Sequence, residues 1–187
     1  LAPYSFMLKF KNKIIIYLVI FLFCSAHSPW SSYLNYRAKH LLIMSVKTDS
    51  PTYPFSELLI NYINKELPEA QSRPARAKDF ERAQSLFSTN QMPLVLLSKQ
   101  NAKDLIRGQG DFKEFGSTEA LVLYGFGDLI LLVQPSLPNR HAWLLLNALK
   151  KSKNVFKDGI SPDKLADIGE AHPGAIMALN GEEMPDS

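Results

Sequence analysis

Short, continuous apolar runs alternate with amphipathic stretches along most of the chain. The runs "HLLIMSV" and "MPLVLLS", and the pair within "TEALVLYGFGDLILLV" hinged at Gly125–Gly127, are typical of strands buried on both faces. We expect the first two strands, Leu41–Val46 and Leu94–Leu97, to be adjacent and parallel. The pair flanking Gly125 is expected to join or border the same sheet.

The clearest helix is expected directly after the first strand. Its apolar residues are spaced i, i+3, i+4, i+7 and i+8, which puts them on one helical face: Phe55, Leu58, Leu59, Tyr62 and Ile63. Pro54 suits the first helical position, where its missing N–H has no intrahelical partner to lose. The segment before it is then the turn between strand and helix.

Four more helices and an edge strand complete the pattern. The helices are expected in "KDFERAQSLFSTN", with Asp79 near its start, in "NAKDLIRG", ended by Gly108, in "NRHAWLLLNALKKS", with Trp143, Leu144, Leu146 and Leu149 mostly inward, and in "SPDKLADIG", with Ser161 as N-cap. Pro74 makes "AQSRPARA" an edge strand rather than a central one. Strands alternating with helices predict an α/β, three-layer sandwich with a mixed, mostly parallel sheet.

Residues 1–26 have the layout of a secretory signal peptide: a basic start, an apolar core and small residues at the end. The apolar core has about ten residues, whereas a membrane-spanning helix needs roughly 20. We expect cleavage after Ala26 or Ser28, with Leu1–Phe6 as an upstream extension. The alternatives are an uncleaved membrane anchor and a lipoprotein, and Phe23 before Cys24 argues against the lipoprotein.

The expected signal peptide also accounts for the net charge. Removing its Lys9, Lys11 and Lys13 from the 21 Lys and Arg residues leaves 18, equal to the 18 Asp and Glu residues. A neutral body with interspersed charges predicts no binding to nucleic acid. A chain of 187 residues, 46% of them hydrophobic, is enough for one packed domain. We assign residues 27–40 to a leader segment, 41–183 to this domain and 184–187 to a tail.

No constellation of residues predicts catalysis, a metal site or a cofactor. The single cysteine, Cys24, lies in the expected signal peptide, so the mature chain has no thiol. The four histidines lack the spacing of a zinc site and are expected at the surface or as caps: His27, His40, His141 and His172. Four residue pairs are expected to be turns or solvated charges: Gly108 and Gly110, Gly125 and Gly127, Arg73 and Arg76, Asp163 and Asp167. For Arg73 and Arg76, the alternative is contact with an anion.

The turn between the first strand and its helix is rich in hydroxyl groups. In α/β sheets, ligands gather at the carboxyl ends of strands, where helices begin, and a helix N-terminus attracts carboxylates or phosphates. The turn from Thr48 to Ser56 is therefore a candidate anion-binding half-site. The alternative is that Asp49, Ser50 and Thr52 only satisfy the hydrogen bonds of the turn and the helix cap.

Four stretches resemble, in their order, segments of one known family. They are "TDSPTYPFSELLINYINKEL", "ARAKDFERAQSLFSTNQMPLVLLS", "GFGDLILLVQPSLPNRHAWLLLNALKKS" and "HPGAIMALNGEE". They resemble the first strand–loop–helix, the next helix and strand, the late return to the first lobe and a C-terminal motif of TAXI-type solute receptors. These receptors are periplasmic binding proteins of tripartite transporters and have the type 2 binding-protein fold. The resemblance covers about residues 41–183.

The resemblance implies one lobe of a two-lobe receptor. Family members close two lobes of similar size on a ligand, but the residues between Ser98 and Gly125 are too few for a second lobe. The sequence Asp49-Ser50-Pro51 also replaces the glycine-rich first loop of the family. The half-site carried over by the resemblance consists of Thr48, Ser50, Thr52, Tyr53, Ser56 and Ser98. A single lobe covers a ligand on one side only, which predicts weak binding unless a partner covers the other.

We therefore expect an exported, periplasmic, non-enzymatic solute-binding-like protein. It binds a small anionic or organic-acid ligand weakly, or with a partner such as a membrane transporter or a second lobe-like subunit. The alternative is an envelope accessory or interaction protein that has lost ligand binding. A half-site requires hydroxyls that point to solvent in a polar cleft, Tyr53 as a wall, and free N–H groups at the start of the helix. A flat or apolar surface favours the alternative.

Overall fold

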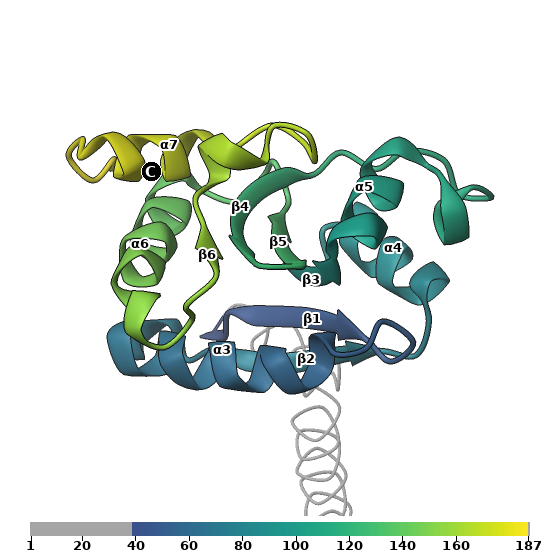
Figure 1. Cartoon of the computed structure of the whole chain (residues 1–187), viewed down its shortest axis with the longest axis horizontal. Coiled ribbons are helices and arrows are strands. Elements are labelled where there is room, and N and C mark those ends of the chain that lie inside the picture. The colour runs from purple at the N-terminus through teal and green to yellow at the C-terminus, as the bar shows by residue number, and fades with distance from the viewer. Residues whose placement is uncertain (1–38, 187) are drawn as a thin grey trace, which may run out of the picture. The chain divides into compact units, whose positions relative to one another are not determined.

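Figure 1 shows a computed structural model of the chain, which describes residues 39–186. The expected signal peptide, its alternatives, and the leader segment up to residue 38 lie outside the described residues. The strands are β1 (Leu42–Val46), β2 (Arg73–Ala77), β3 (Leu94–Ser98), β4 (Leu121–Phe126), β5 (Leu129–Val133) and β6 (Gly159–Ile160). The α-helices are α3 (Thr52–Glu66), α4 (Phe80–Ser88), α5 (Lys99–Arg107), α6 (Asn139–Lys150) and α7 (Pro173–Asn180).

These strands form one open sheet with the order β2-β1-β3-β5-β4-β6. β1 pairs in parallel with both β2 and β3, which confirms that the first two buried strands are parallel neighbours. β4 and β5 lie on either side of the turn at Gly127 and belong to the same sheet, as expected. β2, which contains Pro74, is an edge strand, as the sequence predicts.

The α/β class and the mixed sheet are confirmed. The expectation of a mostly parallel sheet is wrong, because most of the strand pairs are antiparallel. The pairs β3–β5, β4–β5 and β4–β6 are antiparallel. For β4 and β5 the cause is the connection between Phe126 and Leu129, which is too short for anything but a hairpin. Parallel neighbours need a crossover of a dozen or more residues, whereas antiparallel neighbours can be joined by two.

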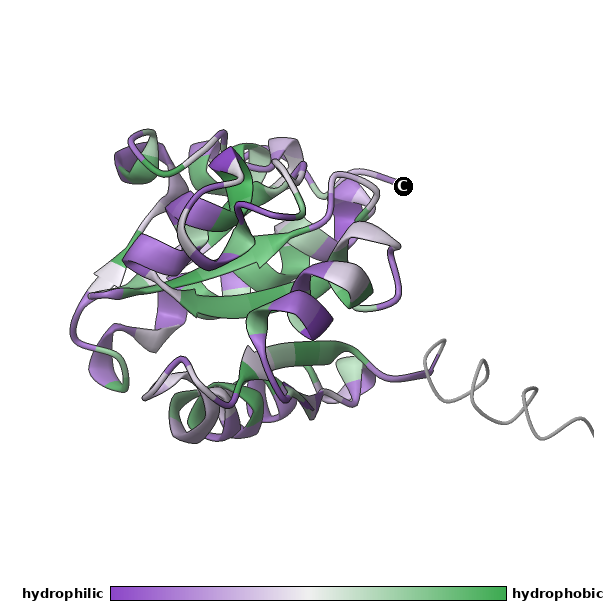
Figure 2. Cartoon of the chain, turned by 90° about the vertical axis from the view of Figure 1, so that its right-hand side faces the viewer, coloured by the Kyte–Doolittle hydropathy of each residue, from purple (hydrophilic) through white to green (hydrophobic). Residues whose placement is uncertain are grey.

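Side chains alternate between the two faces of the sheet and form two separate cores. Ile43 and Leu96 belong to the core that α3, α6 and α7 cover. Their neighbours Met44 and Leu97 belong to the core that α4 and α5 cover. In Figure 1, α6 and α7 lie to the left of the strands and α4 and α5 to the right. The continuous hydrophobic strands lie between helices with hydrophilic outer faces (Figure 2), an arrangement compatible with a three-layer sandwich.

Helix α3 begins two residues earlier than expected, so Pro54 is its third residue and not its first. Proline is tolerated there because the N–H groups of the first turn have no intrahelical acceptor. The predicted apolar stripe is wrong at Leu58, which is 61% exposed. The buried face is centred on Ser56, Leu59 and Ile63, and Leu58 lies outside it because successive residues turn by about 100°.

Two other local predictions need correction. Ser161 precedes the 3₁₀ turn η4 (Pro162–Leu165), and its side chain makes no cap hydrogen bond. Trp143 and Leu144 in α6 are only partly buried, because the helix turns its more deeply buried face toward the sheet. The expected ends of two helices are confirmed: the Asp79 side chain caps α4, and Gly108 ends α5 with a left-handed φ of 63°.

Candidate functional site

The carboxyl ends of β1, β2 and β3 meet at one edge of the sheet, beside the first turn of α3. The loop after β1 is joined to β2 by a hydrogen bond from the Lys47 N–H to the Ala77 carbonyl at 2.9 Å. It is joined to β3 by Asp49, whose Oδ2 accepts from the Ser98 N–H at 2.8 Å. The structure thus brings the predicted loop and Ser98 together, through a residue that was not among the predicted site residues.

Asp49 is only 5% exposed and fills the space between the two strand ends. Ser98 is the N-cap of α5, and its own side chain makes no cap hydrogen bond. A carboxylate is favoured at this position because the helix N-terminus carries a partial positive charge. At the start of α5, the Asp49 carboxylate therefore takes the position expected for the anion of a ligand.

Thr52 and Ser56 do not point to solvent, contrary to the requirement for a half-site. Both are fully buried. The Thr52 hydroxyl donates to the Asp49 carbonyl at 2.6 Å, and the Ser56 hydroxyl donates to the Tyr53 carbonyl at 2.7 Å. A buried hydroxyl needs a partner, and the nearest acceptors are carbonyls of the same turn. These two side chains stabilise the turn and are not available to a ligand.

The first turn of α3 also offers fewer free N–H groups than expected. The Thr52 N–H donates to the Asp49 carbonyl at 3.0 Å, and the Phe55 N–H donates to the Pro51 carbonyl at 3.3 Å. Pro54 has no N–H. Within the described residues, only the Tyr53 N–H of this turn is left without an acceptor.

Three hydroxyls of the predicted half-site remain accessible. Thr48 and Ser50 are exposed, and Ser98 is partly exposed. Neither loop side chain has a hydrogen-bond partner among residues 39–186. The accessible polar groups at this edge are therefore those of the outer loop and not those of the helix.

Tyr53 contacts Arg76, which lies over its ring. The guanidinium carbon of Arg76 lies 4.1 Å from the centroid of the Tyr53 ring. Arg76 reaches this ring because the side chains of Ala75 and Ala77 point into the α4–α5 core, which turns the residue between them toward α3. Both Arg73 and Arg76 are exposed, as expected, but the alternation along β2 would have singled out Arg76.

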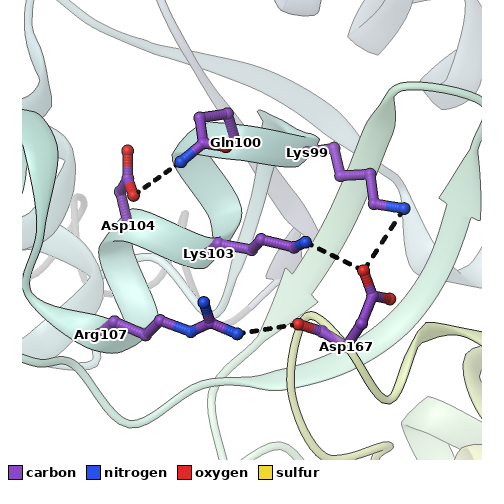
Figure 3. A network of polar contacts seen from close by, with 6 residues as sticks. All are labelled: Lys99, Gln100, Lys103, Asp104, Arg107 and Asp167. Atoms are coloured by element: carbon purple, nitrogen blue, oxygen red, sulfur yellow. Dashed lines mark hydrogen bonds and ion pairs between the residues drawn. The ribbon is translucent and has the colours of Figure 1, made fainter.

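A second group of charged side chains joins α5 to the connection between η4 and α7 (Figure 3). Lys99 and Lys103 lie 3.6 and 2.9 Å from Asp167 Oδ2, and Arg107 donates to the Asp167 carbonyl at 3.0 Å. The hydrogen bond from Lys103, helped by the charges of both lysines, lowers the pKa of the Asp167 carboxyl. Asp167 is exposed, as expected for a solvated charge, and it is also ion-paired with both lysines.

His172 is a capping residue, as expected for the histidines. It is 1% exposed; its Nδ1 accepts from the Gly174 N–H at 3.2 Å, and its Nε2 lies 2.9 Å from the Leu137 carbonyl. These contacts require a neutral ring that carries its proton on Nε2. Burial lowers the pKa of His172, while the bond to Leu137 acts in the opposite direction.

Neither a metal centre nor a membrane span is found in the described part of the chain. No group of three or more His, Cys, Asp or Glu side chains between residues 39 and 186 is arranged to hold a metal ion. Over the same residues, the helices are too short or too polar to cross a bilayer. No family model and no curated protein matches this chain.

Proposed function

We propose that the described domain is a non-enzymatic binding lobe of the solute-binding type, which recognises a carboxylate group at the edge formed by Thr48, Ser50, Tyr53 and Arg76. The observation that carries this proposal is the Arg76 guanidinium, stacked on an aromatic ring and without a carboxylate partner among the described residues. The carboxylate belongs to a small organic acid or to an acidic partner protein.

The chemistry of Arg76 suits this role. A guanidinium presents two parallel N–H groups that match the two oxygens of a carboxylate. The Tyr53 ring limits the orientations of the guanidinium, so less side-chain entropy is lost when an anion binds. The exposed hydroxyls of Thr48 and Ser50 lie on the adjoining loop, which the bond from Lys47 to Ala77 ties to the end of β2.

The fold is compatible with one lobe of a type 2 periplasmic binding protein. Parallel strands β2, β1 and β3 are followed in the sheet by the antiparallel β5, and helices lie on both faces. A single lobe leaves one side of the ligand in water, so the affinity is weak without a partner. The signal-peptide pattern of residues 1–26 supports a location in the periplasm, and an N-terminal anchor is the alternative.

A second candidate, an envelope interaction protein that has lost ligand binding, is favoured by two other observations. The hydroxyls of Thr52 and Ser56 are turned into the protein, and the Asp49 carboxylate already occupies the Ser98 N–H. These groups are therefore not available to a ligand. The test that separates the two candidates is whether the exposed groups around Arg76 bind an anion.

An NMR titration of the full-length chain tests the proposal. Succinate should shift the amide signals of Thr48, Ser50 and Tyr53 together with those at the end of β2. The variant Arg76→Gln should weaken this binding by up to about fivefold, because an exposed ion pair contributes up to about 1 kcal/mol. Arg73→Gln is the matched control: Arg73 lies on the same strand and is also exposed, but it has no aromatic partner among the described residues.

Two arms of the titration separate the sources of the carboxylate. A tetraglutamate peptide that binds more tightly than succinate indicates an acidic protein partner, and the reverse order indicates a small organic acid. Tetraglutamine is the neutral control. The proposal is wrong if neither acidic probe shifts these amides, or if Arg76→Gln binds both as well as the unchanged chain does.

A further inference from the structure

A cavity of about 540 Å³ lies at the opposite end of the sheet from the Arg76 edge. The cavity lies beside the start of β4 and the end of β5, where Leu121 pairs with Val133. The Arg76 edge lies at the other end of the strands, near the pair Ser98 and Leu129. The volume of the cavity falls within the range of about 300–1,000 Å³ that is usual for small-molecule sites. Nothing in the proposed recognition of a carboxylate uses it.

The charged groups that line the cavity are all acidic. Glu119 and Glu170 line it, and no Lys, Arg or His does. Among the residues that the structure describes, neither carboxylate has an ion-pair or hydrogen-bond partner. The nearest cationic helix, α5, directs Lys103 and Arg107 to Asp167 and not into the cavity (Figure 3).

Both glutamates belong to segments that the backbone fixes against neighbouring elements. The Val122 N–H donates to the Glu170 carbonyl at 2.7 Å, and the His172 N–H donates to the Val122 carbonyl at 3.0 Å. The segment that carries Glu119 is held by the bond from the Thr118 N–H to the Leu105 carbonyl at 3.1 Å. The two carboxylates therefore come from two segments, each held by backbone hydrogen bonds, that line the same cavity.

Thr118 adds a third polar group to the cavity. It is 6% exposed, and its Oγ1 accepts from Gln84 Nε2 at 2.8 Å. No acceptor for its hydroxyl proton exists among residues 39–186, and its oxygen can still accept one more hydrogen bond. Gln84 does not itself line the cavity, but its bond to Thr118 fixes the hydroxyl that does.

The remaining wall is largely apolar. Ile106, Leu121 and Pro135 contribute hydrocarbon surface to the cavity. Gly169 lets the acidic segment pass close to this wall, because a Cβ at that position would lie 2.8 Å from Ile106 Cδ1. The cavity therefore combines an acidic side with an apolar side.

We propose that this cavity binds a primary ammonium compound with an apolar body. An ammonium group has three N–H donors, and the cavity offers three acceptor groups to them: the carboxylates of Glu119 and Glu170 and the Thr118 hydroxyl. The hydrocarbon part lies against Ile106, Leu121 and Pro135, where its burial removes apolar surface from water. Such a ligand is chemically opposite to the carboxylate proposed for the Arg76 edge.

An NMR titration with n-hexylammonium chloride on the full-length chain tests this proposal. The amides of Ser117–Leu121 and Gly169–Glu170 should shift with hexylammonium, but not with hexanoate at the same concentration. The double variant E119Q/E170Q keeps the shape of both side chains and should weaken hexylammonium binding about tenfold, because two exposed ion pairs are lost. The double variant E57Q/E69Q removes the same charge at two exposed positions outside the cavity and should bind normally.

Three results would overturn the proposal: no shift at these amides with hexylammonium, equal shifts with hexanoate, or unchanged binding by E119Q/E170Q. The amide spectrum of E119Q/E170Q outside the cavity shows whether that variant is folded. Arg76→Gln should retain hexylammonium binding, so a failure of the carboxylate edge and a failure of this cavity give different results.

Discussion

The carboxylate of Asp49 accepts the N–H of Ser98 at 2.8 Å, although 49 positions separate the two residues in the sequence. This bond ties the loop after β1 to the end of β3 at the edge where the predicted half-site lies. Because Asp49 is buried, water cannot readily take its place as the acceptor for the Ser98 N–H.

Replacing Asp49 should therefore reduce stability more than replacing its exposed neighbours. Asp49→Ala leaves the Ser98 N–H without an acceptor and should lower the free energy of unfolding by about 1–3 kcal/mol. Asp49→Asn keeps an acceptor oxygen and should cost clearly less. Thr48→Ala, an exposed control, should stay within about 0.5 kcal/mol of the unchanged chain. Urea unfolding of the four proteins makes the comparison, and equal stability of Asp49→Ala and Thr48→Ala would contradict it.

Thr52 should matter for stability and not for binding. Thr52→Val keeps the shape of the side chain but removes the hydroxyl that donates to the Asp49 carbonyl, and it should cost about 0.5–1.5 kcal/mol. Thr52→Ser retains the hydroxyl as a control for the lost methyl group. Succinate affinity, measured by the same titration as for Arg76, should be unchanged in Thr52→Val. A loss of affinity without a loss of stability would restore Thr52 to the half-site.

His172 should make the domain less stable as the pH falls below about 6.5, the usual pKa of histidine. Because burial lowers the pKa of His172, the unfolded chain takes up a proton in this range while the folded chain does not. The free energy of unfolding then falls toward low pH, by at most about 1.4 kcal/mol per pH unit for one proton. The fall continues until the pH reaches the lowered pKa of the folded state.

Two asparagine variants isolate this contribution between pH 7 and pH 5. His172→Asn can still cap α7 through its side-chain oxygen but does not titrate, so its stability should change less with pH. His141→Asn changes an exposed histidine and should behave like the unchanged chain. Because the pKa values of Asp79 and Asp167 are lowered, these two carboxyls change stability only below pH 5 and do not affect the comparison. Equal pH slopes for all three proteins would show that His172 does not act in this way.

Gly174 is required by the close approach of α7 to the start of α6. A Cβ at this position would overlap the backbone of Asn139, so Gly174→Ala should cost about 2–3 kcal/mol through overpacking. Gly116→Ala is the matched control, because φ there is 76° but no atom lies within 4 Å of an added Cβ. Its cost should be that of a left-handed alanine alone, about 1 kcal/mol. In thermal unfolding, the melting temperature of Gly174→Ala should be lower than that of Gly116→Ala.

Much of the candidate edge was predictable from the sequence, including Thr48, Ser50 and Tyr53, but the pairing of Tyr53 with Arg76 was not. The hydroxyl-rich turn and the end of the strand at Ser98 follow from the alternation of apolar runs and amphipathic stretches. Which hydroxyls face inward depends on where α3 begins, and that point moved by two residues from the expected one. The partnership of Arg76 with Tyr53 depends on the β1–β2 register, which local sequence does not fix.

The sequence by itself determined the layers of this protein: the buried strands, the helices between them and the edge position of β2. It could do so because the spacing of apolar residues along a short segment shows whether that segment is a helix or a strand and how many of its faces are buried. Only the tertiary structure decided the antiparallel pairing of β3 with β5, the bond from Asp49 to Ser98 and the acidic cavity at Glu119 and Glu170. Each of these joins residues that lie apart in the sequence, and their contacts are set by strand register and helix packing rather than by any local pattern.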